Sequence, residues 1–144
     1  MKQESYLVEG PLEPVFIQKS LSELQSLENA GANAFFLGRV RADVSGESKT
    51  ISIEYSAYAD MVEKAALEIR NSLFNKYDDL ISIGIWHSTG VVSVGEVSLL
   101  VLIASGHRKQ AFAALEECVE LIKEKLPVWK KENFSDGSHH WTNS

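Results

Sequence analysis

The sequence contains few of the features that build disulfide scaffolds or membrane spans. Its single cysteine, Cys118, has no partner for an intrachain disulfide, and one thiolate is too few for a cysteine-based metal cage. No apolar run approaches the ~20 residues that cross a bilayer. The N-terminal stretch MKQESYLVEG is too polar for a signal peptide. We therefore expect a cytoplasmic protein that does not associate with membranes.

Positive charge is also in short supply. The chain has 14 Lys and Arg against 20 Asp and Glu, a net charge of −6, which argues against broad binding to nucleic acid or anionic membranes. Any anion site must then be a local basic pocket. With 44% hydrophobic residues, three prolines and no biased tract, the composition is typical of a globular protein. We expect one domain over residues 1–144.

Two segments have strong helical periodicity, residues 58–75 and residues 108–126. Apolar side chains recur at three- and four-residue steps in both. They are Tyr58, Met61, Val62, Ala65, Ile69 and Leu73 in the first, and Phe112, Leu115, Val119, Ile122 and Leu126 in the second. Pro127 ends the second helix because it lacks an amide hydrogen.

The other apolar segments predict short strands and one short helix. The strands are expected at residues 6–8, 15–17, 34–40, 51–55, 80–86, 91–94, 96–104 and 127–134, with a loop or hairpin tip at residues 42–50. Ser20 or Ser22 is expected to cap the short helix, which ends near residue 29. Strands interrupted by only two long helices predict an α+β fold with a mainly antiparallel sheet.

The candidate functional residues are almost all basic, in an acidic protein. Arg39 and Arg41 close a predicted strand and lie two residues apart, which places both on one face. Two guanidinium groups there could bind a phosphate or a carboxylate. The alternative is that they are solvated charges beside a loop.

A second cluster, Ser105-Gly106-His107-Arg108, lies where a strand passes into a helix. Free helix amides, the helix dipole and two side-chain donors could converge there on one anion. The alternative is an ordinary helix cap in which Ser105 holds the first turn. We expect no metal at His107, because no second histidine follows at ligand spacing.

Lys123 and Lys130 flank Pro127, one in the last helical turn and one in the extended segment that follows. The break lets the two side chains approach each other. A lysine that is desolvated near another cation loses proton affinity and can act as acid, base or nucleophile. Alternatively, Lys123 only complements the helix C-terminus.

The remaining chemistry-bearing residues favour ordinary structural roles. Cys118 adjoins the apolar stripe of the second helix and should pack as a small hydrophobe. Trp86 and Trp129 should pack core or interface surface, and the pair His139-His140 lies near a chain end. No phosphate-binding loop, dinucleotide fingerprint or serine nucleophile motif is present. The residues alone thus indicate an α+β domain with a local anion site and without a cofactor.

Four blocks of the sequence together resemble the large, catalytic subunit of molybdopterin synthase. They are GANAFFLGRVR (31–41), EYSAYADM (54–61), GHRKQAF (106–112) and KEKLPVWKKE (123–132). The blocks stand in the family's order and span most of the chain. The last block, with a lysine four residues before its proline, is the most specific.

This resemblance implies an α/β hammerhead-like fold and a sulfurtransferase of molybdenum cofactor biosynthesis. A small ubiquitin-like partner carries a thiocarboxylate on its C-terminal Gly-Gly tail and gives its sulfur to cyclic pyranopterin monophosphate, forming a dithiolene. Lys123 and Lys130 match the family's catalytic lysines, and Arg41, His107 and Arg108 match its substrate-binding residues, with Arg39 as a further anion contact. The implied assembly is a large-subunit dimer with a small subunit at each end, a heterotetramer.

Two positions depart from the family pattern, and two other functions stay open. Ser56 stands where an acidic residue is common, and Ser88 where relatives usually carry an arginine. One alternative is a non-catalytic docking subunit of the same complex. The other is a phosphate-ester hydrolase that uses His107 and Arg108, although no evident nucleophile accompanies them.

Overall fold

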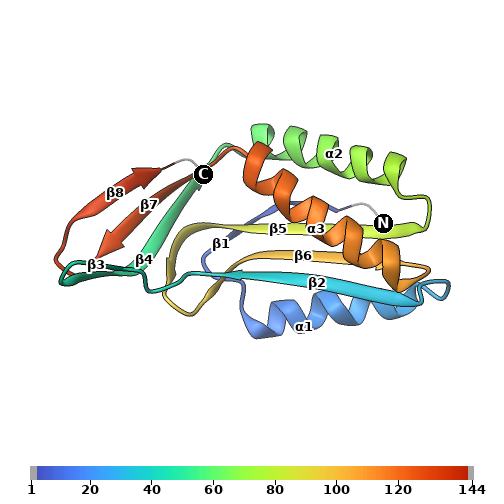
Figure 1. Cartoon of the computed structure of the whole chain (residues 1–144), viewed down its shortest axis with the longest axis horizontal. Coiled ribbons are helices and arrows are strands. Elements are labelled where there is room, and N and C mark those ends of the chain that lie inside the picture. Colours follow the sequence, from blue (N-terminus) through green and yellow to red (C-terminus); the bar gives the residue numbers. More distant parts are fainter. Residues whose placement is uncertain (1–2, 143–144) are drawn as a thin grey trace.

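The computed structural model of the chain describes residues 3–142 and has an α+β fold with a mainly antiparallel sheet (Figure 1). Its helices are α1 (Pro14–Glu23), the 3-10 turn η1 (Leu24–Ser26), α2 (Ala59–Lys76) and α3 (Arg108–Lys125). Its strands are β1 (Leu7–Glu9), β2 (Ala32–Arg39), β3 (Val44–Ser45), β4 (Ser48–Ala57), β5 (Leu80–Ser93), β6 (Val97–Ser105), β7 (Val128–Phe134) and β8 (His139–Thr142). The fold class and the two long helices expected from the sequence are confirmed.

Strand β5 joins two parts of the sheet because it changes partner along its length. The hydrogen-bonded order is β2-β6-β5-β4-β7-β8, with β1 parallel to β5 and β3 paired with β4. Residues 80–87 of β5 pair with β6, whereas residues 90–93 pair with β4. Gly90 starts the second pairing at φ 81°, a conformation that suits glycine. Strands β4, β7 and β8 therefore form an arm that projects beyond the helices (Figure 1).

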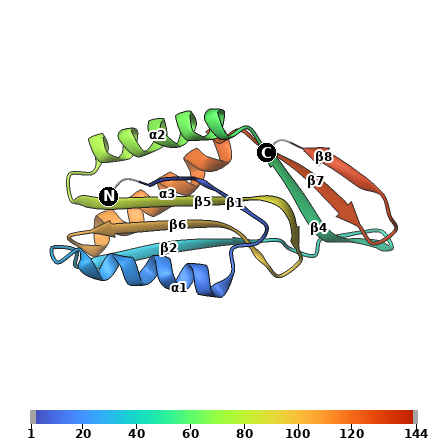
Figure 2. The ribbon, with the colours of Figure 1, turned by 180° about the vertical axis from the view of Figure 1, so that it is seen from behind.

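Helices cover both faces of the other part of the sheet. Figures 1 and 2 show α2 and α3 on one face and α1 on the opposite face. The larger core lies between α2, α3 and the sheet and includes Leu73, Ile85 and Ile103, all fully buried. A smaller core under α1 contains Leu12 and Leu100. Burying each such side chain stabilises the fold by about 1.5–3 kcal/mol.

The predicted strand at residues 15–17 is wrong, because these residues lie in α1. Pro14 stands in the first turn of this helix, where its missing amide hydrogen costs nothing and its fixed φ suits a helix. Ser20 does not cap the helix from outside, since its hydroxyl donates to the carbonyl of Phe16, one turn earlier, at 3.0 Å. The strands predicted separately at residues 80–86 and 91–94 are a single strand, β5.

The predicted buried faces are right in part. Val62, Ile69 and Leu73 are buried in α2 as expected, whereas Met61 in the same helix is exposed, as is Phe112 in α3. The faces of β4 also differ from the simple alternation, because the pairing with β7 shifts between Thr50 and Ser52. Within residues 3–142, no helix is both long enough and apolar enough to cross a membrane.

Replacing Leu73 by Ala should remove one of the principal contacts between α2 and the core. Its side chain is 0% exposed, and truncating a buried leucine costs about 2–5 kcal/mol, because a cavity remains. Urea unfolding monitored by circular dichroism would measure the loss. Leu67→Ala is the matched control on the same helix, where the side chain is 45% exposed; equal losses in the two variants would contradict the packing described.

Candidate functional site

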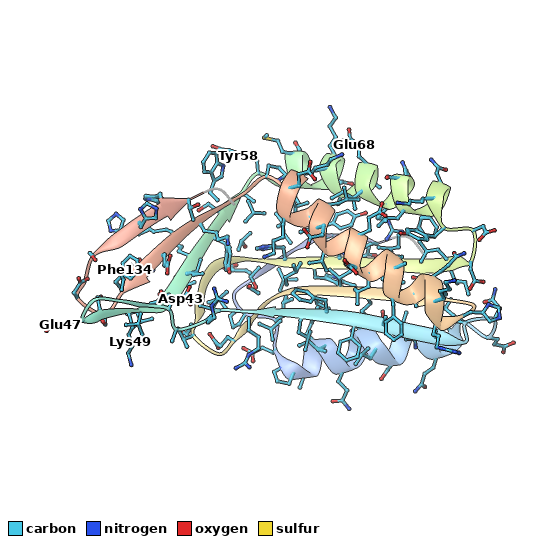
Figure 3. The ribbon with its side chains drawn as sticks, in the orientation of Figure 1. Asp43, Glu47, Lys49, Tyr58, Glu68 and Phe134 are labelled. Atoms are coloured by element: carbon cyan, nitrogen blue, oxygen red, sulfur yellow. The ribbon has the colours of Figure 1, made fainter. Side chains whose placement is uncertain are left out.

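A basic cavity of about 680 Å³ lies where the arm meets the rest of the molecule. The end of β2, the end of α3 and the start of β7 all contribute to its wall. Four cationic side chains line it: Arg39, Arg41, Lys123 and Lys130. Two carboxylates, Asp43 and Glu132, share the cavity with them. Figure 3 labels Asp43 at this junction, far from the tip of the arm.

Lys123 and Lys130 meet at this cavity because the chain changes from helix to strand between them. The helix α3 ends at Lys125, and β7 begins at Val128, directly after Pro127. Lys123 is exposed, while Lys130 is half-buried. Burial lowers the pKa of Lys130 below its ordinary 10.5, the charge of Lys123 lowers that pKa further, and Glu132 opposes both effects. The structure thus brings together the two lysines that the sequence singled out.

Arg39 and Arg41 both line the cavity, although they do not share a strand as expected. The strand β2 ends at Arg39, after a register shift between Gly38 and Arg39. Arg39 donates from Nε to the carbonyl oxygen of Gly95 at 3.0 Å. Strand geometry therefore does not hold the two guanidinium groups side by side.

Arg41 already has an anionic partner inside the molecule. Its Nε lies 2.6 Å from Oδ1 of Asp43, and its Nη2 lies 3.3 Å from Oδ2 of the same carboxylate. The Arg41 side chain is 84% exposed, so solvent weakens this pair. An incoming phosphate or carboxylate has to compete with Asp43 for the same two donors.

His107 and Arg108 lie at the other end of α3, away from the lysines. An α-helix rises 1.5 Å per residue, which places Lys123 roughly 24 Å along the axis from His107. Both residues are exposed. Neither is among the residues that line the basic cavity, within the part of the chain that the structure describes. A single chain therefore does not bring all the predicted site residues together.

The N-terminus of α3 binds a carboxylate of this chain, supplied by Asp79. Its Oδ2 accepts a hydrogen bond from the backbone amide of His107 at 2.7 Å and lies 3.1 Å from His107 Nδ1. Gly106 leaves room for this contact, since a Cβ there would lie 2.4 Å from Asp79 Oδ1. Ser105 acts differently from the expected cap, because its hydroxyl donates to the carbonyl of His107. The sequence analysis missed Asp79, which comes from the loop before β5.

His87, which lies beside Lys123 and Lys130, is a second residue that the sequence analysis missed. It is 8% exposed, and burial together with the charges of Lys123 and Lys130 lowers its pKa to about 4. Its neighbour Ser88 is 0% exposed, and within residues 3–142 nothing hydrogen-bonds to the Ser88 hydroxyl. The sequence signal for His87 was its position directly after the apolar segment that ends at Trp86.

The predicted role of Cys118 as a small packed hydrophobe is confirmed. The side chain is 0% exposed, and burial raises the pKa of its thiol to about 12, so it packs as a hydrophobe. His139 and His140 lie in β8 and are exposed. Within residues 3–142, no three His, Cys, Asp or Glu side chains gather in a way that could hold a metal ion.

Comparison with known proteins gives one consistent result. The family model described as "MoaE protein" matches residues 12–125. The molybdopterin synthase catalytic subunit of Dictyostelium discoideum is 38% identical over 119 residues, covering 82% of this chain and 75% of that protein. The corresponding subunit of Aspergillus niger is 39% identical over 132 residues, covering 91% of this chain and 69% of its own length.

Solved structures have the same fold. Molybdopterin synthase from Staphylococcus aureus superposes with a TM-score of 0.83 at 31% identity, covering 100% of both chains. A chain of the complex of subunits 1 and 2 of molybdopterin-converting factor from Helicobacter pylori superposes with a TM-score of 0.74, covering 88% of this chain and 82% of that chain. At 22% identity the second likeness concerns the fold alone.

Removing the Asp79 carboxylate should destabilise the start of α3. We expect Asp79→Ala to lower the free energy of unfolding by about 1 kcal/mol, the usual loss for a helix N-terminal cap. Asp78→Ala is the control, because within residues 3–142 Asp78 accepts from the side chain of Gln110, at 2.9 Å, and not from the backbone at the start of α3. Chemical denaturation of both variants would measure the difference, and an unchanged Asp79→Ala protein would refute the capping role.

Proposed function

This chain belongs to the MoaE family of molybdopterin synthase catalytic subunits, and we propose that it transfers sulfur to cyclic pyranopterin monophosphate in molybdenum cofactor biosynthesis. The donor is the C-terminal thiocarboxylate of a small ubiquitin-like partner. The observation that carries the proposal is the meeting of Lys123 and Lys130 in a cavity that also presents Arg39 and Arg41. Both the donor tail and the substrate are anions, so each requires cations at its binding site.

The lowered pKa of Lys130 supports a chemical role for the lysine pair. Because burial and the neighbouring Lys123 disfavour its charged form, Lys130 gives up a proton more readily than a surface lysine. We assign Lys123 and Lys130 to positioning the thiocarboxylate and assisting proton or acyl transfer. The thiocarboxylate sulfur forms a bond to a substrate carbon, whose oxygen leaves as water. The bond between this sulfur and the acyl carbon of the tail then breaks, and water supplies the oxygen with which the tail ends as a carboxylate.

Arg41 and Arg39 are assigned to the phosphate of the substrate. Arg41 already contacts the Asp43 carboxylate through two donor nitrogens, which supports a two-point contact with a phosphate. Solvent screens this exposed ion pair, so a phosphate of higher charge can displace Asp43 from Arg41. We expect Asp43 then to swing toward solvent.

A partner chain is part of the proposal. The Helicobacter pylori neighbour is a complex of two subunits of molybdopterin-converting factor, which supports a small second subunit here too. We propose that its C-terminal tail enters the basic cavity, whose volume of about 680 Å³ leaves room for the two glycines at the end of the tail. With a dimer of the large subunit, the assembly is a heterotetramer.

His107 and Arg108 are assigned to the site of a second copy of the chain. They lie roughly 24 Å from Lys123 along α3, too far to share one phosphate with it. An exposed aromatic side chain, Phe112, lies one helical turn after Arg108 in α3 and is 66% exposed. Such aromatic surface favours self-association, through which one copy supplies His107 and Arg108 to the lysines of the other.

Lys123→Ala should abolish sulfur transfer and leave the fold intact. We expect the single-turnover rate of dithiolene formation, with the thiocarboxylated partner, to fall about 10²- to 10⁴-fold, the range for loss of a proton-transferring group. Lys125→Ala is the control, since Lys125 is exposed on the same helical turn and does not line the cavity. Full activity of Lys123→Ala would sink the assignment. No product from the unmodified chain, despite a stable complex, would instead indicate a docking subunit.

Mixing two inactive variants tests whether two copies share each site. If they do, a mixed dimer of Lys123→Ala and His107→Ala contains one intact site, so random exchange should restore about a quarter of the activity. Lys123→Ala mixed with Lys130→Ala is the control, because both changes damage the same half-site and no mixed dimer has an intact site. Equal recovery in the two mixtures, or none in the first, would contradict the shared arrangement.

A further inference from the structure

A water-sized cavity separates His87 from the two lysines. Its volume is about 20 Å³, and its polar walls are His87, Lys123 and Lys130. The other walls are the apolar side chains of Ile122, Leu126 and Val128. A cavity of this size holds one water molecule when polar partners surround it. Within the part of the chain that the structure describes, His87 is therefore the one polar residue besides the two lysines that lines this cavity.

A backbone carbonyl fixes the tautomer of His87. Its Nδ1 lies 2.8 Å from the carbonyl oxygen of Ser88. Because a carbonyl only accepts hydrogen bonds, Nδ1 must carry the proton, and Nε2 of the neutral ring is left with a lone pair. The ring is also held edge-on to Tyr55, with 4.9 Å between centroids and 77° between planes. Both its orientation and its protonation are thus set before any ligand arrives.

The lone pair of Nε2 has no partner among residues 3–142, whereas the lysines need an acceptor. A half-buried ammonium group loses water and is stable only if other acceptors replace it. The ionisable groups that line this cavity are His87, Lys123 from α3 and Lys130 from β7. Outside it, the charge of Glu132 acts on Lys130, and Tyr55 from β4 packs edge-on against the His87 ring. Glu132 is engaged by the hydroxyl of Thr50. A neutral acceptor such as His87 Nε2 can therefore replace the water that the half-buried ammonium group loses, without taking up its proton.

We propose that His87 is a positioning residue for the lysine pair, whose Nε2 accepts a hydrogen bond from the Lys130 ammonium through one water molecule in this cavity. The contact holds the lysine in place at the floor of the basic cavity and limits how far desolvation destabilises its charged form. Its importance for turnover rests on the sulfur-transfer function proposed above. The contact itself belongs to the free chain and does not depend on substrate or partner.

Three substitutions separate this role from simple packing. His87→Asn keeps a short donor for the Ser88 carbonyl but does not reach the cavity. His87→Gln places an amide oxygen close to the position of Nε2, and so keeps the acceptor. His87→Leu fills the space and removes both functions. Thermal unfolding of each variant reports on packing alone.

The decisive measurement is the pKa of Lys130 in the chain without substrate, from ¹³C shifts of labelled lysines followed from pH 7 to 12. Loss of an acceptor disfavours the charged form of the lysine. The pKa of Lys130 should therefore fall by about one pH unit in His87→Asn and His87→Leu. It should stay near the wild-type value in His87→Gln. The exposed Lys125 provides an internal reference that should not change in any variant.

An unchanged pKa of Lys130 in both His87→Asn and His87→Leu would overturn the proposal, whatever their thermal stability. In turnover assays, the alkaline limb of the pH–rate profile should move to lower pH in His87→Asn. In His87→Gln it should lie at the wild-type position. If the lysine shifts appear but no variant or wild-type chain forms dithiolene, the sulfur-transfer function fails while the role of His87 stands. The two hypotheses are therefore tested separately.

Discussion

The change of partner along β5 is the constraint on which the rest of the molecule depends. One end of this strand is bonded to β6 in the helix-covered part of the sheet, and the other end is bonded to β4 in the arm. Since β7 pairs with β4, the segment after α3 must turn back along the arm as soon as the helix ends. The turn falls at Pro127, and it brings Lys130 to the end of α3 that carries Lys123. The basic cavity is therefore a consequence of how one strand is shared.

Gathering four cations around one cavity is unfavourable unless the fold is stabilised elsewhere. Repulsion is lessened by Asp43 on Arg41 and by Glu132 near Lys130. The apolar core between α2, α3 and the sheet stabilises the fold against the remaining repulsion, and Val40 and Ile53 from that core form part of the cavity wall. An anionic substrate and an anionic donor tail relieve the same repulsion when they bind. The site is thus electrostatically incomplete without its ligands, which favours binding of anions over that of neutral analogues.

The sequence predicted those features that depend on residues close together in the chain. The periodicity of α2 and α3 and the break at Pro127 gave both long helices and the pairing of Lys123 with Lys130. The first helix was misassigned in part because Val15, Phe16 and Ile17 form a continuous apolar run like that of a short strand, and because Pro14 suits a helix start as well as a strand edge. Contacts across the fold had no local signal. Asp79 meets His107 from 28 positions away, a contact that spacing along the chain does not reveal.

The two serines that depart from the family pattern both point away from the lysine pair. Ser56 pairs across the arm with Trp129 in β7, on the strand face opposite to that of Lys130, so an acidic residue there would add negative charge beside Trp129. Ser88 follows His87 in a strand, where successive side chains point to opposite faces, so its side chain points away from the cavity that His87 lines. The group that fixes the His87 tautomer is the backbone carbonyl of residue 88. Because every residue supplies that carbonyl, an arginine can be replaced by serine there while the orientation of the imidazole is kept.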